Sequence, residues 1–189
     1  MPDALPAPYP SELERAIVLW DGTRLMIRPI RPDDEPRLVN LYDRLSQHTA
    51  YQRFFTIMKR LPPNWAHFLA NVDYRRRLAL IAEPEPGELV AVARYETTDR
   101  EDTAEIAFVV QDGWQSRGLG TILLADLLAA AEARGIRRFL AYVLAGNTRM
   151  LDLLRRFTEV VEHKTESGVT SLVCIRRPAD RESAGTAPG

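Results

Sequence analysis

The residues of this chain that are best suited to chemistry stand together in the segment AEIAFVVQDGWQSRGLGT, from residue 104 to residue 121. Its glutamate, Glu105, lies inside an apolar run with the composition of a β-strand. Burial raises the pKa of a carboxyl group above the ordinary value of about 4.3, toward the range in which it acts as a general base. Glu105 is therefore a candidate catalytic base.

A structural role for Glu105 is the alternative. In an alternating strand, Ile106 and Phe108 point to one face, while Glu105 and Ala107 point to the other. Both faces are otherwise apolar, which predicts a central strand covered on both sides. A glutamate near the strand end could instead reach solvent or pair with an arginine such as Arg94. The sequence leaves both interpretations open.

The turn after this strand has the features of an anion-binding site. Gly118 and Gly120 carry no Cβ atom, so an anion can approach backbone N–H donors at a helix start, where the helix dipole adds positive charge. This pattern favours a phosphate or pyrophosphate. A helix start that only needs flexible residues is the alternative. A dinucleotide fingerprint would have glycine where Leu123 stands, and no Gly-Lys-Ser/Thr follows as in a P-loop.

A second polar position, Asn147, opens the segment NTRMLDLLRRF directly after a strand-like run. Asparagine is a preferred helix N-cap, and this is the first interpretation. An N-cap at the carboxyl end of a sheet strand can also face a ligand crevice. Arg156, late in the same segment, is more typical of a solvated side chain than of a ligand contact.

Composition limits the classes of function. The chain has 189 residues, of which 46% are hydrophobic and 27% charged, as expected for a single globular domain. The formal net charge of -1 gives no reason to expect nucleic acid or an anionic membrane as a partner. The histidines lack metal-ligand spacing, so no metal is expected; they are His48, His67 and His163.

Other features point to a protein of the reducing cytoplasm. The single cysteine, Cys174, cannot form an intramolecular disulfide and is predicted to be buried in a strand. The N-terminus has no basic-then-apolar signal peptide, and no apolar run is long enough to span a membrane.

The elements that must position these residues alternate between strands and helices. Residues 1–14 and 178–189 have the composition of flexible tails, which leaves one domain over residues 15–177. Hydrophobic periodicity and turn residues predict an α/β domain with a mixed sheet. The predicted strands are 17–20, 23–30, 77–83, 89–98, 103–110, 137–145, 158–165 and 168–175, and the predicted helices are 31–46, 49–61, 63–72, 118–134 and 147–157.

Together these motifs resemble the GNAT superfamily of acyl-CoA-dependent N-acyltransferases, between about Leu25 and Cys174. The resemblance rests on their order: a strand with Glu105, then Gln-x-x-Gly-x-Gly, a long helix, a strand, and Asn-x-x-Met-Leu on a helix. It implies a GNAT-like α/β fold, with a central, mostly antiparallel sheet whose strands splay and are flanked by helices. The segments RPIRPDD, LSQHTAYQRFF and LANVDYRRRLALIA further resemble the bacterial protein lysine acetyltransferases.

The resemblance implies acetyl-CoA as co-substrate and suggests where it binds. The backbone of Ala107, Phe108 and Val109 would pair with the pantetheine arm as if with an added strand. Asn147 and Arg156 would lie along the path of CoA. The pyrophosphate would be held by Gln115, Ser116, Arg117, Gly118, Leu119, Gly120 and Thr121.

Acetyl transfer to a protein lysine is the first functional hypothesis, with an acyl-CoA synthetase as an example of a protein partner. Glu105 would remove the proton of a lysine ammonium, whose pKa is ~10.4, directly or through water. The backbone N–H near Val109 would hydrogen-bond the thioester oxygen as negative charge develops. The second hypothesis is acetylation of a small amine or amino acid, and the third is a CoA-binding regulatory module without turnover.

Three observations would separate these hypotheses. An open acceptor groove favours the protein acetyltransferase, and a small, closed and charged pocket favours the small amine. A Glu105 side chain that is turned away or salt-bridged favours the regulatory module.

The chain also departs from the family pattern. Many members have a tyrosine acid followed by Gly-Phe on the last helix, whereas this chain has LLRRFTEVV. The leaving thiolate is comparatively stable, since a free thiol has a pKa of ~8.5, and a dedicated acid is therefore less necessary. Gln47 and His48 stand where the protein acetyltransferases often have Pro-Glu, which makes the acceptor the least secure inference.

Overall fold

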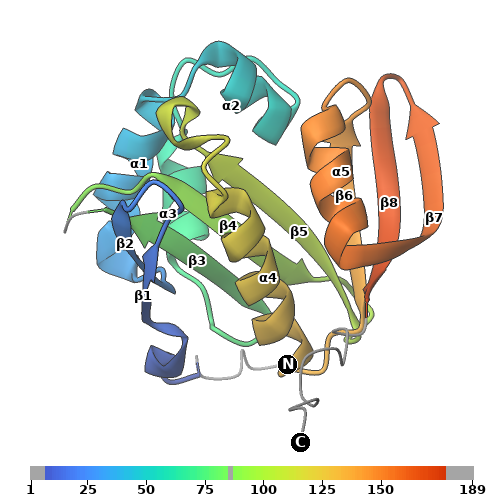
Figure 1. The fold of residues 1–189 in the computed structure, drawn as a ribbon, viewed down its shortest axis with the longest axis horizontal. Coiled ribbons are helices and arrows are strands. Elements are labelled where there is room, and N and C mark those ends of the chain that lie inside the picture. The colour runs from blue at the N-terminus through green and yellow to red at the C-terminus, as the bar shows by residue number, and fades with distance from the viewer. Residues whose placement is uncertain (1–6, 85–86, 178–189) are drawn as a thin grey trace, which may run out of the picture.

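A computed structural model of the chain describes residues 7–84 and 87–177, in which eight strands form one sheet (Figure 1). Their order across the sheet is β1-β2-β3-β4-β5-β6-β8-β7, and every neighbouring pair is antiparallel except β5 and β6. The fold is therefore a mixed α/β sheet that is mostly antiparallel, as predicted. The strands are β1 (Arg15–Val18), β2 (Arg24–Pro29), β3 (Arg77–Glu83), β4 (Ala91–Thr97), β5 (Thr103–Val110), β6 (Arg138–Leu144), β7 (Thr158–Glu166) and β8 (Val169–Arg176).

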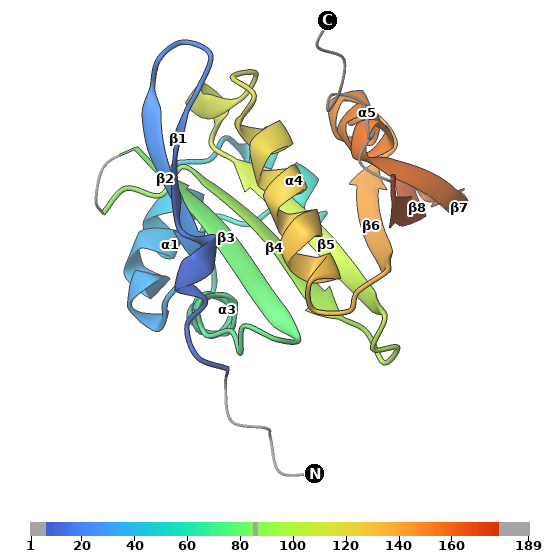
Figure 2. The same cartoon turned by 60° about the horizontal axis from the view of Figure 1, so that its bottom comes forward.

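Helices cover both faces of the sheet (Figure 2). One face carries α4 and α5, and the other carries α1 and α3, while α2 lies against β5. The α-helices are α1 (Glu35–Asp43), α2 (Gln47–Phe54), α3 (Pro63–Ala70), α4 (Leu119–Glu132) and α5 (Thr148–Phe157). Short 3-10 turns occupy Ser11–Leu13, Pro32–Asp34 and Asp112–Trp114. None of the helices in these described ranges combines the length and apolar content needed to span a bilayer.

Each face of the sheet has its own apolar core. Leu123 and Leu127 of α4 are fully buried on one face, where Leu154 of α5 joins them. On the other face, Leu38 and Leu41 of α1 are fully buried, which matches the helical spacing of the apolar residues there. Cys174 on β8 is also fully buried, as predicted. The sheet is thus fixed from both sides.

The largest departures from the predicted boundaries are at the end of one helix and at the N-terminal tail. The helix predicted for residues 49–61 ends at Phe54, because Phe55 adopts the left-handed conformation with φ of 57° and so terminates it. The segment expected to be a tail through residue 14 packs from residue 7 onward. There the Tyr9 ring lies edge-on to Tyr74 at 5.6 Å, and the Tyr9 hydroxyl donates to Glu14 at 2.7 Å. Residues 1–6 and 178–189 lie outside the described residues.

The sheet opens between β5 and β6. These parallel strands pair only from Thr103 to Glu105 on β5 and from Arg138 to Leu140 on β6. Beyond this point β6 continues alongside β8 as far as Leu144, while β5 continues alongside β4. Figure 1 shows β5 and β6 together at their starts and then diverging. Among the described residues, no strand pairs with this backbone edge of β5 after Glu105.

A buried ion cluster joins β2 and β3 to the turn before α1. Arg28 donates to both carboxylate oxygens of Asp34, at 2.7 and 2.8 Å, and to Glu83 at 2.9 Å. Asp34 is fully buried, and burial by itself would raise its pKa. Hydrogen bonds from Arg28, the Arg31 backbone N–H and Arg37 outweigh that effect and hold the pKa of Asp34 below its usual value.

We predict that Asp34→Ala lowers the free energy of unfolding by about 3–5 kcal/mol, because it leaves the Arg28 guanidinium buried with half of its partners removed. Chemical denaturation followed by circular dichroism measures the change. Glu166→Ala is the control, since it removes an ion pair with Lys164 in which both side chains are about 70% exposed, and should change stability by at most about 1 kcal/mol. A similar decrease in the free energy of unfolding in the two variants would contradict the prediction.

Candidate active site

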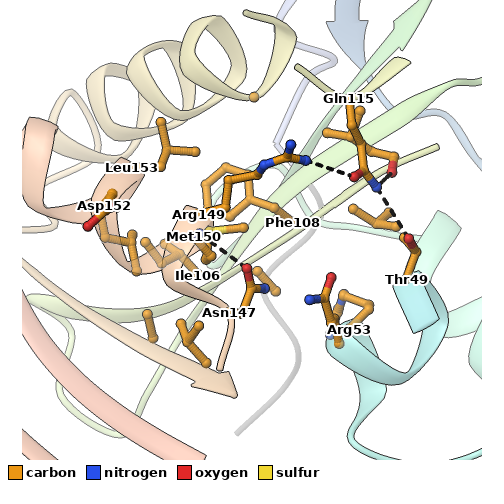
Figure 3. Close-up of a pocket in the computed structure, with 18 of the residues that line it drawn as sticks. Thr49, Arg53, Ile106, Phe108, Gln115, Asn147, Arg149, Met150, Asp152 and Leu153 are labelled. Atoms are coloured by element: carbon orange, nitrogen blue, oxygen red, sulfur yellow. Dashed lines mark hydrogen bonds between the residues drawn. The ribbon is translucent and has the colours of Figure 1, made fainter. Parts of the chain in front are cut away.

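A pocket of about 440 Å³ occupies the opening between β5 and β6 (Figure 3). Its walls are β5 on one side and β6 with the start of α5 on the other, and α2 and the turn before α4 close its ends. The pocket exists because the two strands separate after Glu105. It places the glutamate and the glycine turn of the sequence motif in one cavity.

The turn before α4 has the backbone of an anion-binding site. Ser116 and Gly118 both have positive φ, at 63° and 83°, and Gly118 is the residue that precedes the first helical position. At the start of the helix, the Ile122 N–H donates to the Gly118 carbonyl at 3.2 Å. The N–H groups of Leu119, Gly120 and Thr121 precede it and are free of intrahelical partners, as at any helix N-terminus. The predicted pyrophosphate cradle is therefore geometrically possible.

Gln115 fixes this turn to both walls of the pocket. Its amide donates to the Val110 carbonyl at 3.0 Å and to the Thr49 hydroxyl of α2 at 3.2 Å. Arg149 of α5 donates to the Gln115 side-chain oxygen at 3.3 Å and to the Ser116 hydroxyl at 2.8 Å. Figure 3 shows this chain of contacts from Thr49 through Gln115 to Arg149. The turn is thus held in place by elements from distant parts of the sequence.

Asn147 has the role that its residue type predicts. Its side-chain oxygen accepts a hydrogen bond from the Met150 backbone N–H at 3.2 Å, which caps α5. Asn147 also lines the pocket, so the residue that caps the helix faces the cavity as well. Arg156 lines the pocket from the far end of the same helix.

Glu105 lies at the point where the strands separate. Its side chain is exposed to solvent in the cavity, so the prediction that both faces of this strand are covered was wrong at this position. The surrounding protein still removes part of its hydration, and this desolvation raises the pKa of Glu105; the nearby Glu96 raises it further, while Arg53 lowers it. Within the described part of the chain, no side chain forms an ion pair or hydrogen bond with Glu105. The alternative that Arg94 pairs with it is not seen.

The structure gathers nearly all of the predicted site residues. The side chains or backbone of β5 and of the glycine turn line the pocket together with Asn147 and Arg156. Two side chains point elsewhere. Leu119 is 1% exposed in the core, and Arg117 lies over the Trp114 ring at 4.9 Å and beside Asp21 at 3.6 Å. Those two residues can contribute only their backbone to the cavity.

Sequence reasoning missed Thr49, Arg53 and Arg149, which all line the pocket. Arg149 stands two residues after Asn147, and a basic residue in the first turn of a pocket helix was a usable signal. Thr49 and Arg53 lie on α2, more than fifty residues before Glu105, and no local pattern connects them to it. Only the packing of α2 against β5 brings them to the site.

A second pocket, of about 520 Å³, lies on the α2 and α3 side of the sheet. It shares Arg53, Glu105 and Ala107 with the first, so Glu105 stands where the two meet. Its further lining includes Arg94 and Glu96 of β4 and aromatic residues of α2 and α3. In the described residues, no three His, Cys, Asp or Glu side chains group as a metal-ion site. The geometry provides two adjoining cavities with a carboxylate between them.

Comparison with known proteins identifies the family. Residues 38–158 match the Acetyltransferase (GNAT) family, and the chain belongs to it. Acetyltransferase PA5475 of Pseudomonas aeruginosa is 33% identical over 138 residues, which cover 71% of this chain and 74% of that protein. The protein is therefore a GNAT acetyltransferase, an acetyl-CoA-dependent N-acyltransferase.

Two further relatives are bacterial proteins named Pat. Acetyltransferase Pat of Mycolicibacterium smegmatis is 34% identical over 143 residues, or 74% of this chain, and the match spans 42% of the length of that protein. The crystal structure of the GNAT domain of S. lividans PAT superposes with a TM-score of 0.79 at 37% identity, over 88% of this chain and 98% of that domain. The fold is that of the GNAT domain in these proteins.

We predict that Gly118→Ala weakens acetyl-CoA binding by about tenfold, because alanine at a φ of +83° costs about 1–2 kcal/mol and favours other turn conformations. Gly135→Ala is the matched control. It places alanine at a similar φ of +89°, with no atom within 4 Å of the added Cβ, at a position outside both pockets. Isothermal titration calorimetry gives both affinities. Equal affinities would show that the positive φ of Gly118 is not needed for binding.

Proposed function

We propose that this protein transfers the acetyl group of acetyl-CoA to the ε-amino group of a protein lysine, with Glu105 as the general base. The observation that carries the proposal is the position of Glu105 between the two pockets, with a raised pKa and no ion-pair partner in the described residues. A carboxylate in that position can reach an amine that enters one pocket and a thioester that enters the other. This arrangement favours an enzyme over a regulatory module.

The first pocket is the proposed site of acetyl-CoA. The unpaired edge of β5 at Ala107–Val109 offers backbone groups to the pantetheine amides, as an added strand would. The turn with Ser116 and Gly118 offers N–H groups to the pyrophosphate, and Arg149 is close enough to that turn to add a positive charge. These residues fit a long, anionic co-substrate.

The proposed reaction is direct attack. Glu105 accepts a proton from the lysine ammonium, directly or through water, and the neutral amine attacks the thioester carbonyl carbon. The new C–N bond forms, the C–S bond breaks, and the electron pair leaves with the CoA sulfur. Of the two protons lost by the nitrogen, one ends on the CoA thiol and one in solvent. A backbone N–H near Val109 is the proposed donor to the oxyanion.

The acceptor is proposed from similarity to the Pat proteins, whose GNAT domain this chain matches at 37% identity. An acyl-CoA synthetase is one protein partner of the proposed class. A small amine or amino acid is the second candidate, and the charged lining of the second pocket by Arg53, Arg94 and Glu96 favours it. Both candidates use the same base and the same co-substrate.

We predict that Glu105→Gln lowers kcat by about 10²–10⁴-fold and leaves acetyl-CoA affinity within a few-fold of wild type, because the amide keeps the shape but accepts no proton. In the wild type, activity should fall as the pH drops through a pKa above the ordinary glutamate range, since the base must be deprotonated. That acid limb should be absent from the variant. Initial rates from pH 5 to 9 and calorimetry test both statements, and an unchanged kcat would remove Glu105 from the mechanism.

Radiolabelled acetyl-CoA incubated with the protein and a bacterial cell lysate tests the acceptor. The expected result is label on lysines of a few proteins, located by mass spectrometry, with matching release of CoA thiol. The Glu105→Gln variant serves as the control for non-enzymatic acetylation. Label found only in the small-molecule fraction would favour the second candidate and contradict the protein substrate.

A further inference from the structure

The second pocket contains a cation that the described residues do not neutralise. Arg94 projects from β4, is partly buried and lines this pocket. One of its guanidinium nitrogens donates to the Leu69 carbonyl at the end of α3, at 2.7 Å. Over residues 7–84 and 87–177, no carboxylate approaches the guanidinium within ion-pair distance. The fold therefore holds a positive charge here without the partner that most buried arginines have.

The Arg94 guanidinium has N–H donors that are not used by the described residues. An arginine side chain presents five N–H donors in a planar fork, and the Leu69 carbonyl uses one nitrogen. Burial lowers the pKa of Arg94 to about 10, which still leaves it charged at neutral pH. A planar fork with free donors matches the two oxygens of a carboxylate. The geometry suits a carboxylate that a ligand brings in.

The strand register places this cation beside the proposed base. Arg94 lies opposite Ala107, and Glu96 lies opposite Glu105, in the antiparallel pair of β4 and β5. These alternate residues share one face of the sheet, and Arg94 is the diagonal neighbour of Glu105, at a spacing of about 7–8 Å. The pocket thus carries the carboxylates of Glu96 and Glu105, with Arg53 acting on Glu105, and the Arg94 guanidinium lies one diagonal step further along the sheet. An acceptor with an amine and a carboxylate has the complementary pattern.

We propose that Arg94 is a specificity-determining residue that binds a carboxylate carried by the acceptor, close to the amine that is acetylated. The carboxylate can be an acidic side chain next to a target lysine in a peptide, or the α-carboxylate of a free amino acid. The inference rests on the proposed function, because it assumes that Glu105 accepts a proton from the acceptor amine.

The test compares acceptors that differ only in one carboxylate. One pair consists of peptides with a single lysine flanked by aspartate or by asparagine, and the other of free lysine and lysinamide. Initial rates of CoA thiol release give kcat/KM for the wild type and for Arg94→Gln. We expect the wild type to prefer the carboxylate member of one pair by about 10–100-fold, the range of a charge-assisted hydrogen bond, and the variant to lose this preference.

Two further variants keep the test decisive. Arg94→Lys keeps a positive charge without the fork, and should retain part of the preference even if Arg94→Gln folds poorly. Arg24→Gln removes an exposed arginine from β2, outside both pockets, and should leave the preference unchanged. Thermal unfolding shows whether each variant keeps its fold. Calorimetry with acetyl-CoA shows whether it keeps its affinity for the co-substrate.

The outcomes separate the inference from the proposed function. The pair that shows the preference identifies the source of the carboxylate. If the wild type transfers acetyl without any preference, or if Arg94→Gln keeps the same preference, the role of Arg94 is overturned. The proposed function is unaffected by either result. If the wild type transfers acetyl to neither the peptides nor the amino acids, the proposed function itself fails.

Discussion

The separation of β5 from β6 is the constraint on which the rest of the structure depends. Because their pairing ends at Glu105 and Leu140, the following residues of β5 keep a backbone edge that no strand in the described part of the chain occupies. Such an edge is costly to bury unless something pairs with it. The cavity along this edge is the place where an extended ligand can replace the missing strand. After their pairing ends, β5 stays hydrogen-bonded to β4 and β6 to β8, while the apolar core under α4 includes residues of all four strands.

The same separation determines the electrostatics of the site. It leaves Glu105 at the junction of two cavities, where it is neither buried in the core nor paired with an arginine in the described residues. Partial desolvation, with Glu96 on the neighbouring strand, raises its pKa, and Arg53 on α2 moderates the shift. A carboxylate in this intermediate environment remains accessible to an amine and to water. The fold supplies a candidate base without the cost of a fully buried charge.

Helix α2 and helix α5 complete the site from two distant parts of the chain. Thr49 on α2 and Arg149 on α5 both contact Gln115, so the turn before α4 is held from either side. The α2 side also reaches the second pocket, where Arg53 lies beside Glu105. The two cavities are therefore linked through one helix. In this chain, the motif of strand, glycine turn and helix is thus only the central part of a site that other elements close.

The sequence by itself determined the order of elements, the strand that carries Glu105, the glycine turn and the cap at Asn147, because each depends on local propensities and spacing. It also gave the GNAT resemblance, which the comparisons confirm. Only the tertiary structure decided that Glu105 is exposed in a cavity, that Leu119 and Arg117 turn away from it, and that Thr49, Arg53, Arg149 and Arg94 line the two pockets. Those facts depend on how α2, β4 and α5 pack around β5, and contacts between residues far apart in the chain leave no periodic signal in it.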